Sequence, residues 1–183
     1  MVMPSAPADR NWLPDDIWAF PDDGVRRECI DGMLLVTPSP SGEHQDVVRE
    51  FLLDLGIWLR AHPAAIVRAS PSDVRLTHDS VVQPDVYVFA DRAALRDGKV
   101  LLAIEVLSPG TARYDRGLKR RFYQRLRVGE YWIVDLEAQL VERWRPEDER
   151  PEVLGETLTW QPPGPDGPLT IDLPTLFGRA LGT

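Results

Sequence analysis

Val100-Leu-Leu-Ala-Ile-Glu-Val-Leu107 is an almost unbroken apolar run with one carboxylate inside it. A continuous apolar run of this kind is typical of a strand that is buried on both faces of a sheet. Glu105 would then be removed from water, which is costly unless a partner compensates its charge. The run therefore predicts a central strand whose single acid is either ion-paired or part of a functional site.

A second acid, Asp85, follows Pro84 and opens another apolar strand, Val86-Tyr-Val-Phe89. Taken alone, Asp85 is explained as a strand-start residue that caps a turn, and Glu105 as the partner of an arginine. Taken together, two carboxylates on neighbouring strands repel each other unless a cation holds both. Hard oxygen ligands and several waters describe a Mg²⁺ site. We interpret Asp85 and Glu105 as the ligands of one metal.

Lys119 is unusual for this chain, which has only one other lysine, Lys99, and otherwise uses arginine as its cation. Lysine is a compact point charge whose pKa shifts readily, which suits it to orient a water or neutralise a phosphate. Tyr123 lies one helical turn further on, so both side chains can line one face. Chance retention of the lysine is the alternative explanation.

Two further polar residues are ambiguous from the residues alone. His44 is in register with the apolar stripe of its predicted helix, where a buried structural histidine is the commoner explanation. Glu28 lies in the first strand of a predicted hairpin, where a plain exposed acid is equally consistent. We keep both as candidates for the rim of the site.

The order of elements predicts a mixed sheet flanked by helices. Ser41 is a suitable N-cap for a long helix, Asp31-Gly32 supplies hairpin turn residues, and the helix from Asp115 would cross over between two parallel strands. The local patterns predict helices over residues 13–20, 41–62 and 115–128, a hairpin over 25–36, and strands over 65–69, 72–77, 81–89, 100–107, 131–135 and 140–144.

The length of 183 residues fits one domain, 1–183, with a flexible lead at 1–10 and a loop rich in proline and glycine at 161–168. The single cysteine, Cys29, excludes an intramolecular disulfide, which suits a reducing cytoplasm. No stretch approaches the ~20 apolar residues of a membrane span. We expect a cytoplasmic protein with no membrane partner.

Charge is unevenly distributed along the chain. The net charge of −8 argues against binding nucleic acid by bulk electrostatics. Residues 113–127, however, contain seven cations against one acid, Asp115. A solvated helix face explains such a run more often than a binding surface does, and both interpretations stay open.

Six stretches, in this order, resemble the Uma family of restriction endonuclease-like proteins, a branch of the PD-(D/E)xK nuclease superfamily. The resemblance spans roughly residues 25–144. The stretches are Glu28-Cys29-Ile30-Asp31-Gly32; Pro38-Ser39-Pro40 with His44; Gln83-Pro84-Asp85-Val86; Ile104-Glu105-Val106-Leu107-Ser108-Pro109; Asp115 with Lys119 and Tyr123; and Glu130-Tyr131-Trp132-Ile133-Val134-Asp135.

The resemblance implies a nuclease core with the element order αβββαβ, preceded here by an N-terminal β-hairpin. It also implies that Asp85 and Glu105 are the two metal-binding acids. Leu107 departs from the superfamily pattern, because a lysine should stand two residues after the glutamate. The resemblance implies that Lys119, on the following helix, takes that role.

The expected activity is therefore hydrolysis of a DNA phosphodiester with Mg²⁺, or Mn²⁺, as cofactor. The metal ligands would be Asp85, Glu105 and the backbone carbonyl of Val106, and the catalytic candidates are these two acids with Lys119, Tyr123, Glu28 and His44. Phosphate contacts would come from the basic helix, and such contacts carry no sequence information. The expected phosphate-binding residues are Arg113, Arg116, Arg120 and Arg121.

Two other classes of function remain open. A nuclease-fold protein can bind nucleic acid or a protein without cutting, which the acidic net charge and the lack of a recognisable specificity domain favour. An assembly module is the third class, with the hairpin from Trp132 to Trp144 as a dimer surface, although Trp144 and Trp160 are equally consistent with a core. We expect a homodimer.

Overall fold

The computed structural model describes residues 11–164 and 167–182. The predicted flexible lead at 1–10 lies outside the described residues, as does part of the predicted loop at 161–168. In the part of the chain that the structure describes, no helix is both long and apolar enough to cross a membrane.

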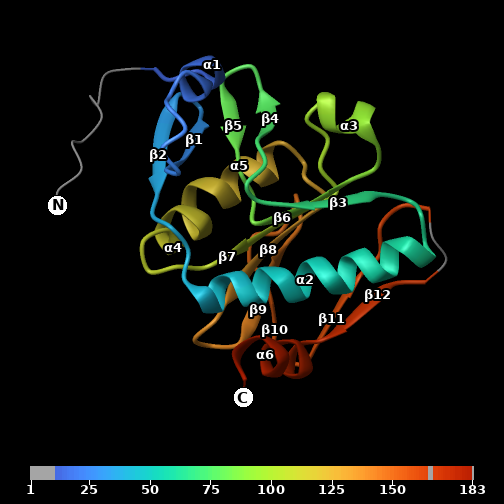
Figure 1. The fold of residues 1–183 in the computed structure, drawn as a ribbon. Coiled ribbons are helices and arrows are strands. Elements are labelled where there is room, and N and C mark those ends of the chain that lie inside the picture. The colour runs from blue at the N-terminus through green and yellow to red at the C-terminus, as the bar shows by residue number, and fades with distance from the viewer. Residues whose placement is uncertain (1–10, 165–166, 183) are drawn as a thin grey trace.

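A six-stranded mixed sheet forms the centre of the fold (Figure 1). Its strands are β3 (Ile66–Ala69), β6 (Val86–Phe89), β7 (Leu102–Val106), β8 (Glu130–Asp135), β9 (Leu140–Trp144) and β10 (Glu152–Leu154). They lie in the order β10-β9-β8-β7-β6-β3, and β7 pairs in parallel with β8 while all other neighbours are antiparallel. Every residue of β7 is buried, as the apolar run predicted.

Two helices and a hairpin cover one face of this sheet. Alternate residues of its strands, such as Val86, Ile104 and Trp132, pack against helix α2 (Gly42–Ala61) in one hydrophobic cluster. The same cluster includes the C-terminal hairpin of β11 (Thr157–Trp160) and β12 (Leu169–Asp172), and helix α6 (Leu173–Leu181). Figure 1 shows α2 running along the sheet with α6 beyond it.

The other face is covered by a small sheet and a helical segment. The four-stranded sheet has the order β2-β1-β5-β4 and follows the short helix α1 (Pro14–Trp18). Its strands are β1 (Arg26–Ile30), β2 (Met33–Thr37), β4 (Val74–Thr77) and β5 (Ser80–Val82). The helical segment consists of α4 (Ala112–Tyr114), the π-helical turn η1 (Asp115–Lys119) and α5 (Arg120–Arg125). Phe122 and Tyr123 pack against Tyr131 and Ile133 on this face.

The predicted strand over 81–89 is wrong in one respect, because the chain breaks at Gln83-Pro84-Asp85. Pro84 has no N–H to donate, so it cannot continue a ladder in the interior of a sheet. The chain uses this break to leave β5 in the small sheet and enter β6 in the large one.

The other predicted elements are present with shifted bounds. The first hairpin turns at Asp31 and Gly32, whose φ values of 49° and 77° fit the predicted turn. The crossover helix begins earlier than predicted, at Ala112, and contains the π-turn η1. The sequence analysis did not predict α3 (Arg92–Arg96), β10, β11, β12 or α6.

Candidate active site

Asp85 and Glu105 meet on one face of the large sheet. In the antiparallel β6–β7 pair Val86 lies opposite Ile104, so the next position along places Asp85 beside Glu105. Both carboxylates are buried. Glu105 lies on the face of the sheet opposite α2, since its neighbours Ile104 and Val106 pack on the α2 side. The two acids that the sequence singled out are therefore neighbours on adjacent strands.

Asp85 is held as a carboxylate by three groups. The Val106 N–H donates to Oδ2 over 2.8 Å, and His44 Nε2 lies 3.2 Å from the same oxygen. Arg26 Nη1 donates to Oδ1 over 2.8 Å. Burial pushes the pKa of Asp85 upwards, but the hydrogen bond from His44 and the charge of Arg26 outweigh it and hold the pKa at about 2.

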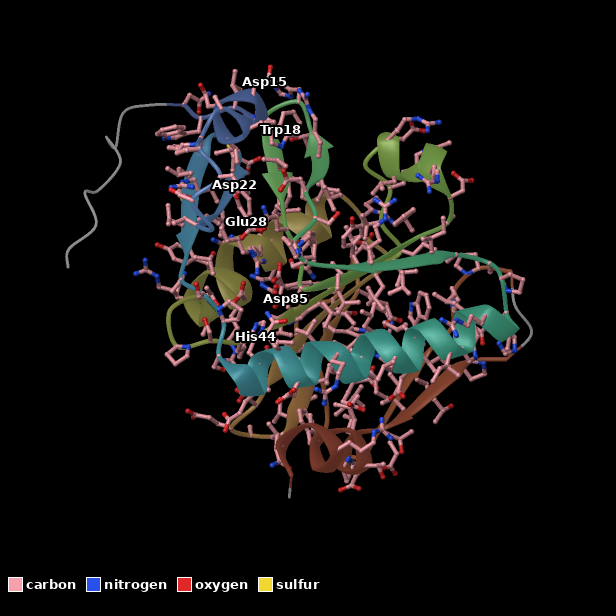
Figure 2. The ribbon with its side chains drawn as sticks, viewed as in Figure 1. Asp15, Trp18, Asp22, Glu28, His44 and Asp85 are labelled. Atoms are coloured by element: carbon pink, nitrogen blue, oxygen red, sulfur yellow. The ribbon has the colours of Figure 1, made fainter. Side chains whose placement is uncertain are left out.

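His44 reaches Asp85 because of how α2 begins. The Ser41 side chain accepts a hydrogen bond from the His44 N–H over 3.2 Å, which is the predicted N-cap. The cap fixes His44 in the first turn, and Figure 2 shows His44, Asp85 and Glu28 following one another from α2 towards β1. His44 lines the cavity beside Asp85, as its predicted place at the rim requires.

Lys119 enters the same cluster from the turn η1. Its Nζ lies 2.9 Å from Glu105 Oε1, 2.8 Å from Glu28 Oε2 and 3.8 Å from Asp115 Oδ1. Burial alone would lower the pKa of Lys119, but the surrounding carboxylates raise it above its ordinary value, so the lysine stays charged. Lys119, to which the resemblance assigns the role of the lysine absent from β7, thus contacts Glu105.

Glu105 has the opposite electrostatic character from Asp85. Its complete burial raises the pKa to about 8, with Lys119 opposing this rise and Asp85 adding to it. The Tyr123 hydroxyl donates to Glu105 Oε1 over 3.3 Å, and the pKa of that tyrosine is raised by burial and by Glu105. Two neighbouring acids therefore differ in proton affinity, which is a frequent property of catalytic pairs.

Glu28 lies beneath the site and not at its rim. Its side chain is completely buried, so the reading as a plain exposed acid is wrong. Its Oε1 accepts the Gln83 N–H over 2.8 Å, and its Oε2 faces Lys119. Glu28 thus connects Lys119 to the segment Gln83-Pro84-Asp85, where the chain leaves one sheet for the other.

Sequence reasoning missed two members of the cluster, Arg26 and Asp115. Asp115 is buried and stands four residues before Lys119, a helical spacing that signalled a pair. Arg26 stands two residues before Glu28 in β1, and residues i and i+2 of a strand share a face. That spacing was the available signal, but it does not distinguish Arg26 from any other exposed arginine.

The residues that converge here fit a divalent metal with few protein ligands. No group of three or more His, Cys, Asp or Glu with metal-binding geometry occurs within residues 11–164 and 167–182. Mg²⁺, however, is commonly held by one or two carboxylates with several waters. The Arg26 guanidinium lies between Asp85 and Glu105, 2.8 and 3.4 Å from their oxygens, and so stands in for a cation. The two carboxylates fit the donor chemistry of Mg²⁺, and the metal site stays a prediction.

A cavity of about 20 Å³ opens beside these carboxylates, and a hollow of about 560 Å³ adjoins it. Pro38 and Ser108 line both, so the two lie next to each other. The larger hollow is bounded by the loop before α2 and the loop after β7, and it is the space next to the site in which a substrate could lie.

The four arginines expected to contact phosphate differ in their surroundings. Arg116 pairs with Asp135 and Glu142, each over 2.7 Å. Arg120 bonds Gln124 over 2.8 Å and covers the Trp144 ring, and Arg113 stacks on the ring of Tyr114. Arg121 is exposed and forms no ion pair with any described residue. The phosphate-binding role of all four stays a prediction, and Arg116 is the least available.

The hairpin proposed as a dimer surface does not expose its tryptophans. Trp132 and Trp144 are buried, and Trp160 is buried as well. The alternative, that these tryptophans belong to the core, is the one observed. The homodimer stays a prediction.

One family model matches residues 14–174 of the chain, and it is the Uma2 model, described as "Putative restriction endonuclease". The chain belongs to the Uma2 family. The resemblance inferred from six short stretches is thereby confirmed, over a longer part of the chain than those stretches cover. No protein of curated function matches this Uma2 chain.

The fold of this Uma2 protein also matches a solved structure, the crystal structure of "a putative nuclease belonging to DUF820" from Anabaena variabilis. The two chains are 21% identical, and the match covers 92% of this chain and 98% of that chain with a TM-score of 0.72. The predicted α/β, restriction-endonuclease-like fold with a mixed sheet is therefore confirmed. At this identity the match shows the fold alone.

Proposed function

We propose that this Uma2 protein is a metal-dependent endonuclease that hydrolyses phosphodiester bonds in DNA. One observation carries the proposal: two buried carboxylates from adjacent strands and a buried lysine from the crossover helix converge on one small cavity. Burying this many charged groups costs free energy that their mutual pairing recovers only in part. Clusters of this kind are therefore frequent at functional sites. Family membership supports the nuclease assignment.

Asp85, Glu105 and the carbonyl of Val106 would hold Mg²⁺ or Mn²⁺. When bound, the metal supplies a water of lowered pKa and stabilises negative charge on the phosphate. Asp85 is ready to act as a ligand, because its pKa is about 2. Glu105 must first release the proton that its pKa of about 8 lets it keep at neutral pH.

Lys119 provides a fixed positive charge at the site. Its raised pKa keeps the ammonium protonated, so it acts by orienting a water or neutralising charge and not as a general base. Tyr123 donates to the same Glu105 oxygen that faces the lysine and thus fixes the rotamer of that carboxylate. Glu28 holds Lys119 from below and positions it.

The proposed phosphate contacts come from the helical segment whose residues Ala112 and Arg116 line the adjoining hollow. Arg113 and Arg121 are exposed on the helical segment and remain the best candidates for phosphate contacts. Arg116 lines the hollow but is already paired with two acids. Phosphate contacts of this kind would position a DNA strand on the protein without reading its base sequence.

A second function is favoured by a specific observation. Arg26 already fills the gap between the two acids, so the cluster is charge-compensated without a metal. This arrangement supports a nuclease-fold module that binds nucleic acid or protein without cutting. Metal binding and cleavage separate the two candidates.

The test measures plasmid cleavage with Mg²⁺ and with Mn²⁺, and metal affinity by calorimetry. The variants are Asp85→Asn and Glu105→Gln. Asp54→Asn is the matched control, because Asp54 is a partly buried acid on α2 that pairs with Arg179 outside the cluster. We expect cleavage by wild type and the control and none by the two site variants. A folded wild type that neither binds metal nor cleaves would leave the binding module as the function.

A further inference from the structure

Arg26 is the outermost cation of the cluster. Its Nη1 lies 2.8 Å from Asp85 Oδ1 and its Nη2 lies 3.4 Å from Glu105 Oε2. The arginine side chain is 19% exposed, whereas those of the two acids are 4% and 3% exposed. The guanidinium therefore closes the gap between the metal-binding acids from the solvent side.

The space around Arg26 is too small for a hydrated ion. The cavity that it lines measures about 20 Å³, which is room for about one water. Mg²⁺ gives up its waters reluctantly and keeps several of them in most protein sites. With the guanidinium in place, the gap cannot accept the ion together with its water and a phosphate oxygen.

The charge balance requires some cation in this gap. Four carboxyl groups meet here, and the full positive charges facing them are those of Lys119 and Arg26. Lys119 is held between Glu105 and Glu28 and its side chain is only 4% exposed, against 19% for Arg26. Arg26 is the more exposed of the two cations and the one able to move outwards. Its Nη atoms donate to the two acids and to the Gln83 carbonyl, whereas its buried Nε has no hydrogen-bond partner.

We propose that Arg26 is an internal counter-ion that competes with the divalent metal for the gap between Asp85 and Glu105. Metal binding then requires the guanidinium to swing out, and the metal replaces one positive charge with two. The inference rests on the proposed metal-dependent function, because it concerns the regulation of the same site. It makes the metal-free protein a closed state and lowers the apparent affinity of the site for the metal.

The test is a calorimetric Mg²⁺ titration of wild type and Arg26→Met, with Mn²⁺ in parallel. Arg27→Met is the matched control, because Arg27 is the next residue and pairs with Asp23, away from the cluster. We expect Arg26→Met to bind Mg²⁺ at least tenfold more tightly than wild type, and Arg27→Met to match wild type. Equal or weaker binding by Arg26→Met would overturn the competition.

A second measurement uses the wild-type protein and does not depend on how the variant folds. The Nε–H of Arg26 is buried, so its side-chain NMR signal exchanges slowly with water when metal is absent. We expect saturating Mg²⁺ to convert it to the fast exchange of a solvated arginine. A signal that stays protected at saturation would overturn the proposal.

The two proposals fail in different ways. If wild type and Arg26→Met bind Mg²⁺ with equal affinity and wild type cleaves DNA, the competition is wrong and the nuclease stands. If Arg26→Met binds more tightly but neither protein cleaves, the competition stands and the nuclease is wrong. If neither protein binds the metal, both are overturned.

Discussion

Replacing Lys119 by methionine should destabilise the protein strongly, since this lysine is surrounded by acids. Its Nζ lies within 2.9 Å of Glu105 and Glu28 and 3.8 Å from Asp115, and all of these side chains are buried. Methionine fills much of the same volume but leaves the carboxylates without their central cation. Breaking a buried charge cluster in this way costs about 3–5 kcal/mol.

That loss is a large part of a stability of about 5–15 kcal/mol. For a chain of this size it corresponds to a melting temperature lower by about 6–20 °C. The deficit should shrink as the pH falls, because protonating the stranded carboxyls removes the uncompensated charge. Urea unfolding from pH 8 to pH 5, with calorimetric melting in parallel, measures both effects.

Lys99→Met is the control, as Lys99 is the only other lysine of the chain. Its side chain is 74% exposed and its Nζ lies 3.6 Å from Asp97. An exposed pair of this kind contributes at most about 1 kcal/mol. If Lys119→Met is no less stable than Lys99→Met, the lysine does not hold the cluster together and the reasoning is refuted.

The pH dependence of Glu105 and variants of two other residues test the remaining contacts of the cluster. Folding raises the pKa of Glu105 to about 8, so the stability of the metal-free protein should fall as the pH rises from the ordinary glutamate pKa of about 4.3 to pH 8. Over the same range the Mg²⁺ affinity measured by calorimetry should rise about tenfold per pH unit and level off near pH 8. An affinity that is flat between pH 6 and 8 would contradict this. Glu28→Gln keeps an acceptor for the Gln83 N–H but removes the charge facing the lysine, and should cost about 1–3 kcal/mol in urea unfolding; no loss would show that Glu28 is dispensable. His44→Ala removes the partner of Asp85 Oδ2 and should weaken Mg²⁺ binding about 10–100-fold, with unchanged affinity counting against a supporting role.

The parts of the fold that local pattern dictates could be predicted from the sequence. The apolar run around Glu105 predicted a buried central strand, and Ser41 predicted the start of α2. The strand Thr157–Trp160 alternates exposed and buried residues, so its pattern was readable although the sequence analysis did not use it. Asp172, which caps α6, was a similar local signal.

The missed part of the site depends on contacts between distant segments. Arg26 meets Asp85 and Glu105, 59 and 79 residues further along the chain, and nothing in its own neighbourhood indicates either partner. Glu28 had the same difficulty, because a strand residue next to polar neighbours gives no sign of complete burial. Asp85 and Glu105 could be singled out because each is a carboxylate in or next to an apolar strand, and Lys119 because the chain otherwise uses arginine. Arg26 has no such local signal.

The break at Gln83-Pro84-Asp85 means that the cluster belongs to neither sheet alone. The small sheet contributes Arg26 and Glu28, the large sheet contributes Glu105, and the chain passes from one to the other at Asp85 itself. The site is therefore indivisible: a fragment or chimera that keeps only the large sheet would retain both acids yet lose the residues that neutralise and position them. A chimera that keeps the cluster intact must therefore exchange both sheets together, with the N-terminal hairpin included.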